Sequence, residues 1–76
     1  MENNNVDPYE IYTYDVYFED AQDSNNKGFK ESYAYCLDYI LTNNGTETSY
    51  FTDYKGGTVS IVRNESGETV YEELVK

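Results

Sequence analysis

The residue types that could carry chemistry are few in this chain of 76 residues. It has no histidine, which removes the commonest general base and the commonest metal ligand. The single cysteine, Cys36, has no histidine to activate it and falls among apolar residues at helical spacing, so we expect a buried, inert thiol. Gly28 stands alone where a phosphate-binding loop would need several glycines. The sequence therefore predicts no catalytic residues, no cofactor and no enzyme.

An acidic segment that begins at Asp23 matches part of a calcium-binding loop. This register places Asn25 at the third position and Gly28 at the sixth, as an EF-hand requires. Lys27 then takes the fifth position and Ala34 the twelfth, where a bidentate glutamate is needed. We therefore predict no metal site. Spacing alone leaves paired carboxylates for acid–base or glycoside chemistry open, although so small a fold offers little room for a cleft.

Negative charge is the strongest feature of the composition. Fifteen acidic residues against five basic ones give a net charge of −10. Such a surface repels nucleic acid and anionic membranes, so we expect direct binding to neither. The charge also exceeds what solubility needs and costs self-repulsion. A basic partner is the simplest reason for it.

The sequence predicts a chain that is not exported. A lone cysteine cannot form an internal disulfide, which favours a reducing, cytoplasmic setting. The first residues, MENNNVDPYE, lack the positive and apolar regions of a signal peptide. No apolar run approaches the roughly 18 residues that span a membrane. We expect residues 1–8 to be a flexible leader and residues 9–76 to be a single acidic domain in the cytoplasm.

Residues 9–19 (YEIYTYDVYFE) give the clearest strand, because they are dense in aromatic and β-branched residues. A period of two sorts their side chains onto two faces. The uniformly large face, predicted to meet the core, holds Tyr12, Tyr14, Val16 and Phe18. The mixed face, predicted to be wet, holds Tyr9, Ile11, Thr13, Asp15, Tyr17 and Glu19. The residues after it, 20–28, have the composition of a loop.

A helix is predicted over residues 28–43. Its apolar face recurs at helical spacing through Phe29, Tyr33, Cys36, Leu37, Ile40 and Leu41. Residues 43–45 (NNG) supply a C-terminal stop, with Gly45 free to take the left-handed conformation.

The remainder reads as β-structure. Residues 47–54 are a strand candidate, a turn follows at 55–57, and residues 58–63 and 68–75 form a hairpin around the turn 64–67. The predicted fold is α+β, with one helix packed on a small antiparallel sheet in the order β-α-β-β-β. The residues expected to be largely buried are Val16, Phe18, Leu37, Ile40, Leu41 and Ile61.

The candidate partner-binding site lies on the wet face of the first strand and the loop after it. It comprises Asp15, Tyr17, Glu19, Asp20 and Asp23, and no basic residue occurs between Met1 and Asn26. Residues two apart on a strand lie about 6.6–6.8 Å apart on one face, so Asp15 and Glu19 flank the ring of Tyr17. Carboxylates held on a rigid sheet can occupy a groove that otherwise binds phosphates. The alternative is an ordinary solvated sheet face.

A short, histidine-free, acidic α+β chain rich in Asn and Tyr resembles the small proteins with which phages and mobile elements block host defence. Anti-CRISPR and anti-restriction proteins are the familiar groups, and several of them are DNA mimics. The stretch DYKGGTVSIVRNESGETVYEE, residues 53–73, is also similar to hairpins of small proteins from mobile elements of gut Firmicutes. This resemblance carries no catalytic motif and transfers no functional residue.

Three functional hypotheses follow. The first is a non-enzymatic inhibitor that occupies the basic surface of a nucleic-acid-binding bacterial defence complex, with DNA mimicry as one form of this action. The second is a structural module that dimerises, or joins a complex, through a sheet edge. The third is a small enzyme or metal-binding protein. The first two leave both a monomer and a homodimer open, and their binding should differ in salt dependence.

Overall fold

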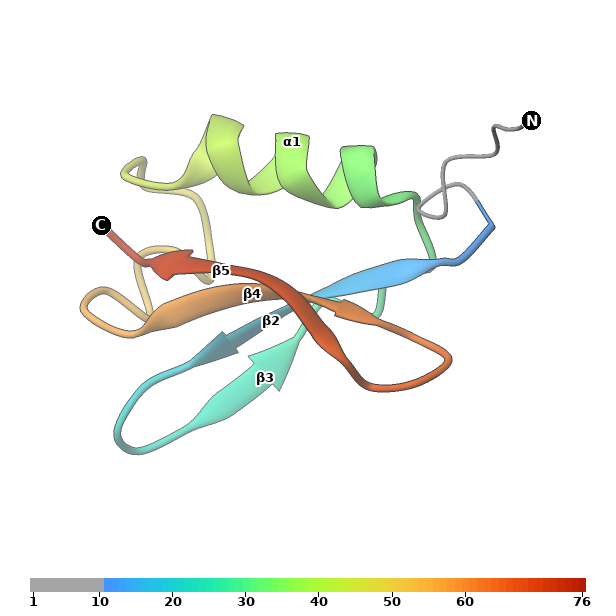
Figure 1. Ribbon diagram of the computed structural model, residues 1–76. Coiled ribbons are helices and arrows are strands. Elements are labelled where there is room, and N and C mark those ends of the chain that lie inside the picture. Colours follow the sequence, from blue (N-terminus) through green and yellow to red (C-terminus); the bar gives the residue numbers. More distant parts are fainter. Residues whose placement is uncertain (1–10) are drawn as a thin grey trace.

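A computed structural model describes residues 11–76 of the chain. The elements follow one another as β2 (Tyr14–Glu19), β3 (Ser24–Asn26), α1 (Tyr33–Asn43), β4 (Thr58–Arg63) and β5 (Thr69–Leu74). The four strands form one antiparallel sheet in the order β3-β2-β4-β5. The helix α1 lies across one face of this sheet (Figure 1). The predicted class, one helix on a small antiparallel sheet, is confirmed. The predicted leader, Tyr9 and Glu10 lie outside the described residues.

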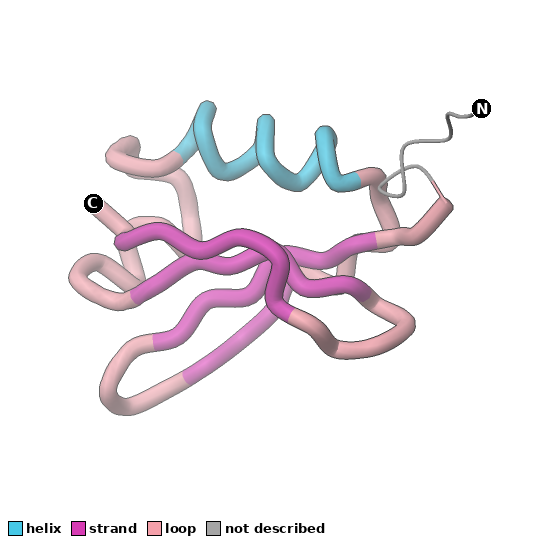
Figure 2. Tube along the Cα trace, viewed as in Figure 1, coloured by secondary structure: helices cyan, strands magenta, loops and turns pink. Residues whose placement is uncertain are grey.

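The central strand β2 follows the predicted period of two. Tyr14, Val16 and Phe18 are fully buried and face α1. On either side β2 pairs with β3 and with β4, so its backbone is bonded along both edges. The helix and the sheet form the two layers that Figure 2 shows, and the core fills the space between them.

The order of the elements along the chain differs from the predicted order in two segments. Residues 24–26 form a short strand where a loop was expected, because their backbone pairs with β2 and the Asp20 N–H donates to the Asp23 carbonyl at 2.9 Å. All three side chains of β3 are exposed, so no apolar pattern marks this edge strand in the sequence. The observed order is β-β-α-β-β.

The second difference is in residues 47–54, which form turns rather than the predicted strand. Thr52 and Tyr54 donate backbone hydrogen bonds to the carbonyls four residues earlier, at 3.1 and 3.0 Å. These tight turns bring Phe51 and Tyr54 to the same side, where both rings pack against Phe18. A strand would have sent residues three apart to opposite faces.

The helix begins five residues later than predicted. Ser32 caps it, with its hydroxyl accepting from the Tyr35 N–H at 3.0 Å. The preceding backbone is already engaged, because Glu31 and Tyr14 exchange hydrogen bonds at 2.7 and 3.2 Å. At the other end the prediction is confirmed: the helix ends at Asn43, and Gly45 has a φ of +90°.

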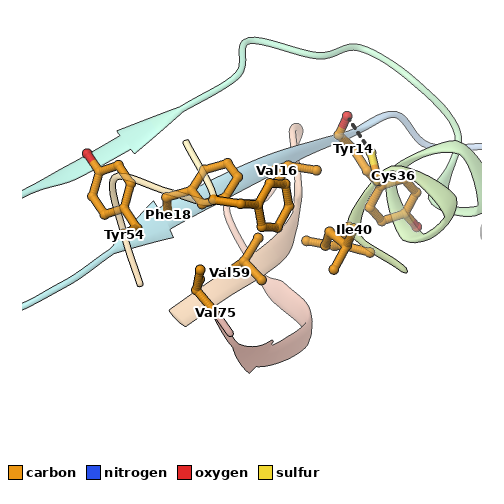
Figure 3. Packing of buried hydrophobic residues seen from close by; sticks show 10 residues of the cluster. Tyr14, Val16, Phe18, Cys36, Ile40, Tyr54, Val59 and Val75 are labelled. Carbon is orange, nitrogen blue, oxygen red and sulfur yellow. Dashed lines mark hydrogen bonds between the residues drawn. The ribbon is translucent and has the colours of Figure 1, made fainter. Parts of the chain in front are cut away.

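The fully or nearly fully buried core draws on every layer of the fold (Figure 3). Its members are Tyr14, Val16, Phe18, Cys36, Ile40, Phe51, Tyr54, Val59, Ile61 and Val75. Two residues that were predicted to be largely buried are more exposed than expected. Leu37 is half-buried. The prediction for Leu41 is wrong, because this residue is 61% exposed. Cys36 and Ile40 point at the sheet, and the leucine after each lies about 100° further around the helix.

The C-terminal hairpin matches its prediction. Strands β4 and β5 pair directly, and the turn at 64–67 closes with Arg63 donating to the Glu68 carbonyl at 2.9 Å. Gly67 takes the positive φ, 76°, that this turn requires. A bulge interrupts the register between Ile61 and Val62.

Candidate partner-binding surface

The sheet face that turns away from α1, called the open face here, carries polar and acidic side chains. The strand register places two rows of directly opposed residues on it. One row is Asn26, Tyr17, Ser60 and Glu72, and the other is Ser24, Glu19, Thr58 and Leu74. Tyr17 lies on the central strand with 38% of its surface exposed. Among the residues of β2 to β5 the one basic side chain is Arg63, which is paired with Tyr14 and so lies on the helix side.

Three of the predicted site residues gather at the end of the sheet where β2 turns into β3. Glu19 ends β2, and Asp20 and Asp23 lie in the connecting loop. We call these three residues the acidic hairpin. The Asp20 Oδ1 accepts from the backbone N–H groups of Gln22 and Asp23 at 2.9 and 2.8 Å, which fixes the turn. The structure therefore brings Tyr17, Glu19, Asp20 and Asp23 together along one hairpin.

A tyrosine from the 47–54 turns fixes the carboxylate of Asp23. The Tyr54 hydroxyl donates to the Asp23 Oδ2 at 2.8 Å. This hydrogen bond is the main reason that the pKa of Tyr54 is raised to about 12, with desolvation and the charges of Asp23 and Asp20 acting in the same direction. The carboxylates are thus held by the fold, although their charges remain at the surface.

Asp15 does not belong to this surface, and the prediction that it lies on a wet face is wrong. Its side chain is 3% exposed. The Oδ1 atom accepts from the N–H groups of Val16 and Phe29, each at 2.7 Å. The Oδ2 atom accepts from the Asn26 Nδ2 at 2.8 Å and the Gly28 N–H at 3.1 Å. The chain after β3 crosses over this carboxylate. The alternation of side chains along the strand predicted the correct face of the sheet for Asp15, but it could not show that another segment covers this residue.

The basic residue that is nearest to the acidic hairpin in sequence points to the other side of the sheet. The Lys27 N–H donates to the Val16 carbonyl at 3.0 Å, which places its side chain on the helix side with Val16. Its ammonium lies over the rings of Tyr50, Tyr39 and Phe29, at 4.5, 5.8 and 5.9 Å from the centroids. The sequence showed the aromatic residues, but only the fold brings these three rings around one lysine.

Within residues 11–76 no ion pair joins a basic side chain to Glu19, Asp20 or Asp23. In residues 11–76 the recorded ion pair joins Arg63 and Glu68 at 3.3 Å, at the far hairpin. Lys27 is engaged by aromatic rings on the opposite face. A cation from outside this part of the chain is free to meet the acidic hairpin.

Cys36 is buried, as predicted, beneath the helix. Its thiol donates to the Tyr14 carbonyl at 3.5 Å, the contact drawn in Figure 3. Desolvation, followed by the charges of Asp15 and Glu31, raises its pKa to about 12. A thiol in this state has almost no nucleophilic thiolate at neutral pH.

The described residues show no enclosed site for a ligand. Within 11–76 there is neither a pocket nor a group of three acidic or cysteine side chains placed to hold a metal ion. In the same residues no helix has the length and apolar character needed to cross a membrane.

Comparison of the chain with protein-family models, with curated proteins and with solved structures finds no match.

Proposed function

We propose that this chain is a non-enzymatic binding protein that acts in the cytoplasm by occupying a basic surface of a nucleic-acid-binding bacterial defence complex, of the anti-CRISPR or anti-restriction kind. The observation that carries the proposal is the uncompensated acidic hairpin, Glu19, Asp20 and Asp23, beside the exposed ring of Tyr17. Fixed carboxylates on a rigid scaffold attract a positive groove as phosphates do. Tyr17 would add apolar contact at the place of a base or sugar.

The rigidity of the hairpin supports this role. The backbone hydrogen bonds to Asp20 and the Tyr54 hydrogen bond to Asp23 hold both carboxylates in place before any partner arrives. A pre-organised charge pattern loses less conformational entropy on binding than a mobile loop does.

The experiment is a neutralisation at constant shape. A triple variant, Glu19→Gln, Asp20→Asn and Asp23→Asn, removes three charges but keeps an acceptor oxygen for each hydrogen bond described above. The matched control, Asp38→Asn, Glu47→Gln and Glu65→Gln, removes the same charge at exposed positions elsewhere. The partner is obtained by low-salt capture from a nuclease-treated bacterial lysate and then purified.

We expect the hairpin variant to bind this partner at least about tenfold more weakly and with a flatter salt dependence. The control should bind like the wild type, and duplex DNA should compete with the wild-type protein. Equal losses in the two variants would show an effect of net charge alone. An unchanged affinity and salt slope in the hairpin variant would end the proposal.

A further inference from the structure

The outer edge of β5 is a second surface, at the edge of the sheet opposite to β3 in the order β3-β2-β4-β5 (Figure 1). The N–H and C=O groups of Val75 point toward the segment that precedes β4. Its N–H donates to the Gly57 carbonyl at 2.9 Å, and its carbonyl accepts from the Gly56 N–H at 3.0 Å. Main-chain groups alternate along a strand, so those of Glu72 and Leu74 point outward, away from β4. An outward row of N–H and C=O groups is a template for another strand.

One end of this edge is already paired by a side chain. The Asn44 Nδ2 donates to the Leu74 carbonyl at 2.8 Å, and the Asn44 Oδ1 accepts from the Lys76 N–H at 2.8 Å. A side-chain amide offers the same donor and acceptor as a peptide group. Asn44 therefore takes the place that one peptide group of a fifth strand would hold. It does not pair with the outward main-chain groups of β5 that precede Leu74.

Apolar side chains lie on both sides of the edge. Asn44 shows which flank of the helix faces β5, and Leu37 and Leu41 lie on the same flank by helical spacing. Leu41 is 61% exposed on the helix side, and Leu74 is 67% exposed on the open face. Tyr71, on the helix side opposite Ile61, is half-buried. A strand added here would place alternate side chains over Leu41 and over Leu74.

The charge around the edge selects the occupant. The β4–β5 hairpin carries Glu65, Glu68, Glu72 and Glu73, with Arg63 as its one basic residue, already paired with Glu68. A second copy of this chain, paired antiparallel about Glu72, would place Glu72 directly opposite Glu72 of that copy. Like charges in that position are destabilising, and each copy has a net charge of −10. An extended segment with lysine or arginine fits the same edge favourably.

We propose that the outer edge of β5 binds an extended, basic segment of a partner protein as a fifth strand, with apolar residues of that segment against Leu41 and Leu74. Binding at this edge does not require the acidic hairpin, because the partner segment pairs with the main chain of β5, at the edge of the sheet opposite to β3.

The test uses the full chain and a defined probe, a ten-residue peptide in which pairs of lysines alternate with pairs of valines, so that each face of the extended strand carries both residue types. The informative variant is Glu72→Pro, which removes the outward N–H at a position where an edge strand tolerates proline. Glu72→Gln is its matched control, since it removes the same charge and keeps the N–H. Leu41→Ser removes the apolar contact. The variants' affinities and the backbone amide shifts of the wild-type protein are measured.

We expect the peptide to perturb the amides of β5, and Glu72→Pro to bind at least about fivefold more weakly than Glu72→Gln. Leu41→Ser should weaken binding by about twofold to fivefold. Three results would overturn the proposal: no binding, equal affinity of the proline and glutamine variants, or shifts confined to the acidic hairpin. A wild-type homodimer that Glu72→Pro dissociates would overturn it as well, by assigning the edge to a second copy. The wild-type amide shifts decide the location even if Glu72→Pro does not fold.

Discussion

The carboxylate of Asp15 accepts a hydrogen bond from the backbone N–H of Phe29 at 2.7 Å, across fourteen positions of the chain. Together with the bonds from Gly28 and Asn26, this contact fixes the segment that leads from the sheet to the helix. Asp15 is thus a structural residue of the fold, in a place where an exposed carboxylate was predicted.

The first prediction concerns this carboxylate. Asp15→Ala leaves the N–H groups of Gly28 and Phe29 without their acceptor, so we expect a loss of about 2–4 kcal/mol in the free energy of unfolding. Asp15→Asn keeps one acceptor oxygen and should lose less. Urea titration measures both, and Glu19→Gln, at an exposed position of the same strand, is the control. If Asp15→Ala is as stable as Glu19→Gln, the hydrogen bonds contribute nothing.

The second prediction concerns Gly57, which is buried beneath the end of β2. A Cβ at this position would clash with the carbonyl oxygen of Glu19 and crowd the Cβ of Asp20. We expect Gly57→Ala to cost about 1–3 kcal/mol through a forced backbone shift. Gly56→Ala, where a Cβ meets open space, should cost only about 1 kcal/mol, from the strain of its positive φ. Thermal midpoints should rank the two variants in that order, and the reverse order would contradict the close approach.

The third prediction concerns the thiol of Cys36. Its pKa of about 12 in the folded chain lies above the ordinary value of 9.0. The stability that it contributes is therefore complete below pH 9.0 and is lost as the pH rises from there through about 12. Cys36→Ala should show a shallower loss of stability over this alkaline range than the wild type. At pH 8 the native thiol should react with a thiol reagent only as fast as the protein unfolds, and rapid reaction without unfolding would refute its burial.

The fourth prediction concerns Glu73, whose carboxylate accepts from the Tyr71 hydroxyl and from the Asn44 Nδ2 at 2.6 Å. Burial raises its pKa, but the two hydrogen bonds and the charge of Lys76 outweigh burial and hold the pKa below the ordinary 4.5. Its contribution is then present above pH 4.5 and is lost as the pH falls through the folded-state pKa. Glu73→Gln should be less stable than the wild type at pH 7, and the difference should shrink below pH 4.5. Glu72→Gln, which removes the same charge on the open face, is the control.

The fifth prediction concerns the rings around Lys27. Lys27→Gln removes the cation from Tyr50, Tyr39 and Phe29, and we expect a loss of about 1 kcal/mol. Lys30→Gln removes the same charge at an exposed position and should change stability by less than about 0.5 kcal/mol. Chemical denaturation of the two variants separates the contact from the net charge. Equal midpoints would mean that the rings do not stabilise the ammonium.

Local patterns predicted the parts of the fold in which side chains alone decide the geometry. The alternation at Tyr14, Val16 and Phe18 identified the buried face of β2, and the turn at 64–67 identified the hairpin of β4 and β5. Both signals are complete within a few neighbouring residues. The signal for the C-terminal end of the helix is equally local, because Gly45 alone marks it.

The errors arose where a distant segment decides the outcome. The burial of Asp15 depends on the path of residues 26–29, and the exposure of Leu41 depends on how far the helix covers the sheet. The strand β3 exists because β2 offers it an edge, although its own residues are polar. For the candidate site, the sequence therefore identified Tyr17, Glu19, Asp20 and Asp23 as exposed or half-exposed residues of one hairpin, and misplaced the one residue that another segment covers.

The central position of β2 also sets the order in which the chain is expected to fold. The β4–β5 hairpin joins neighbouring residues and can form within microseconds. The β2–β4 pairing, which aligns Glu19 with Thr58, requires all of residues 20–57 to be closed into a loop first. Formation of the ladder between β2 and β4 should therefore limit the folding rate, and substitutions at Val16 or Val59 should slow folding more than substitutions at the 64–67 turn.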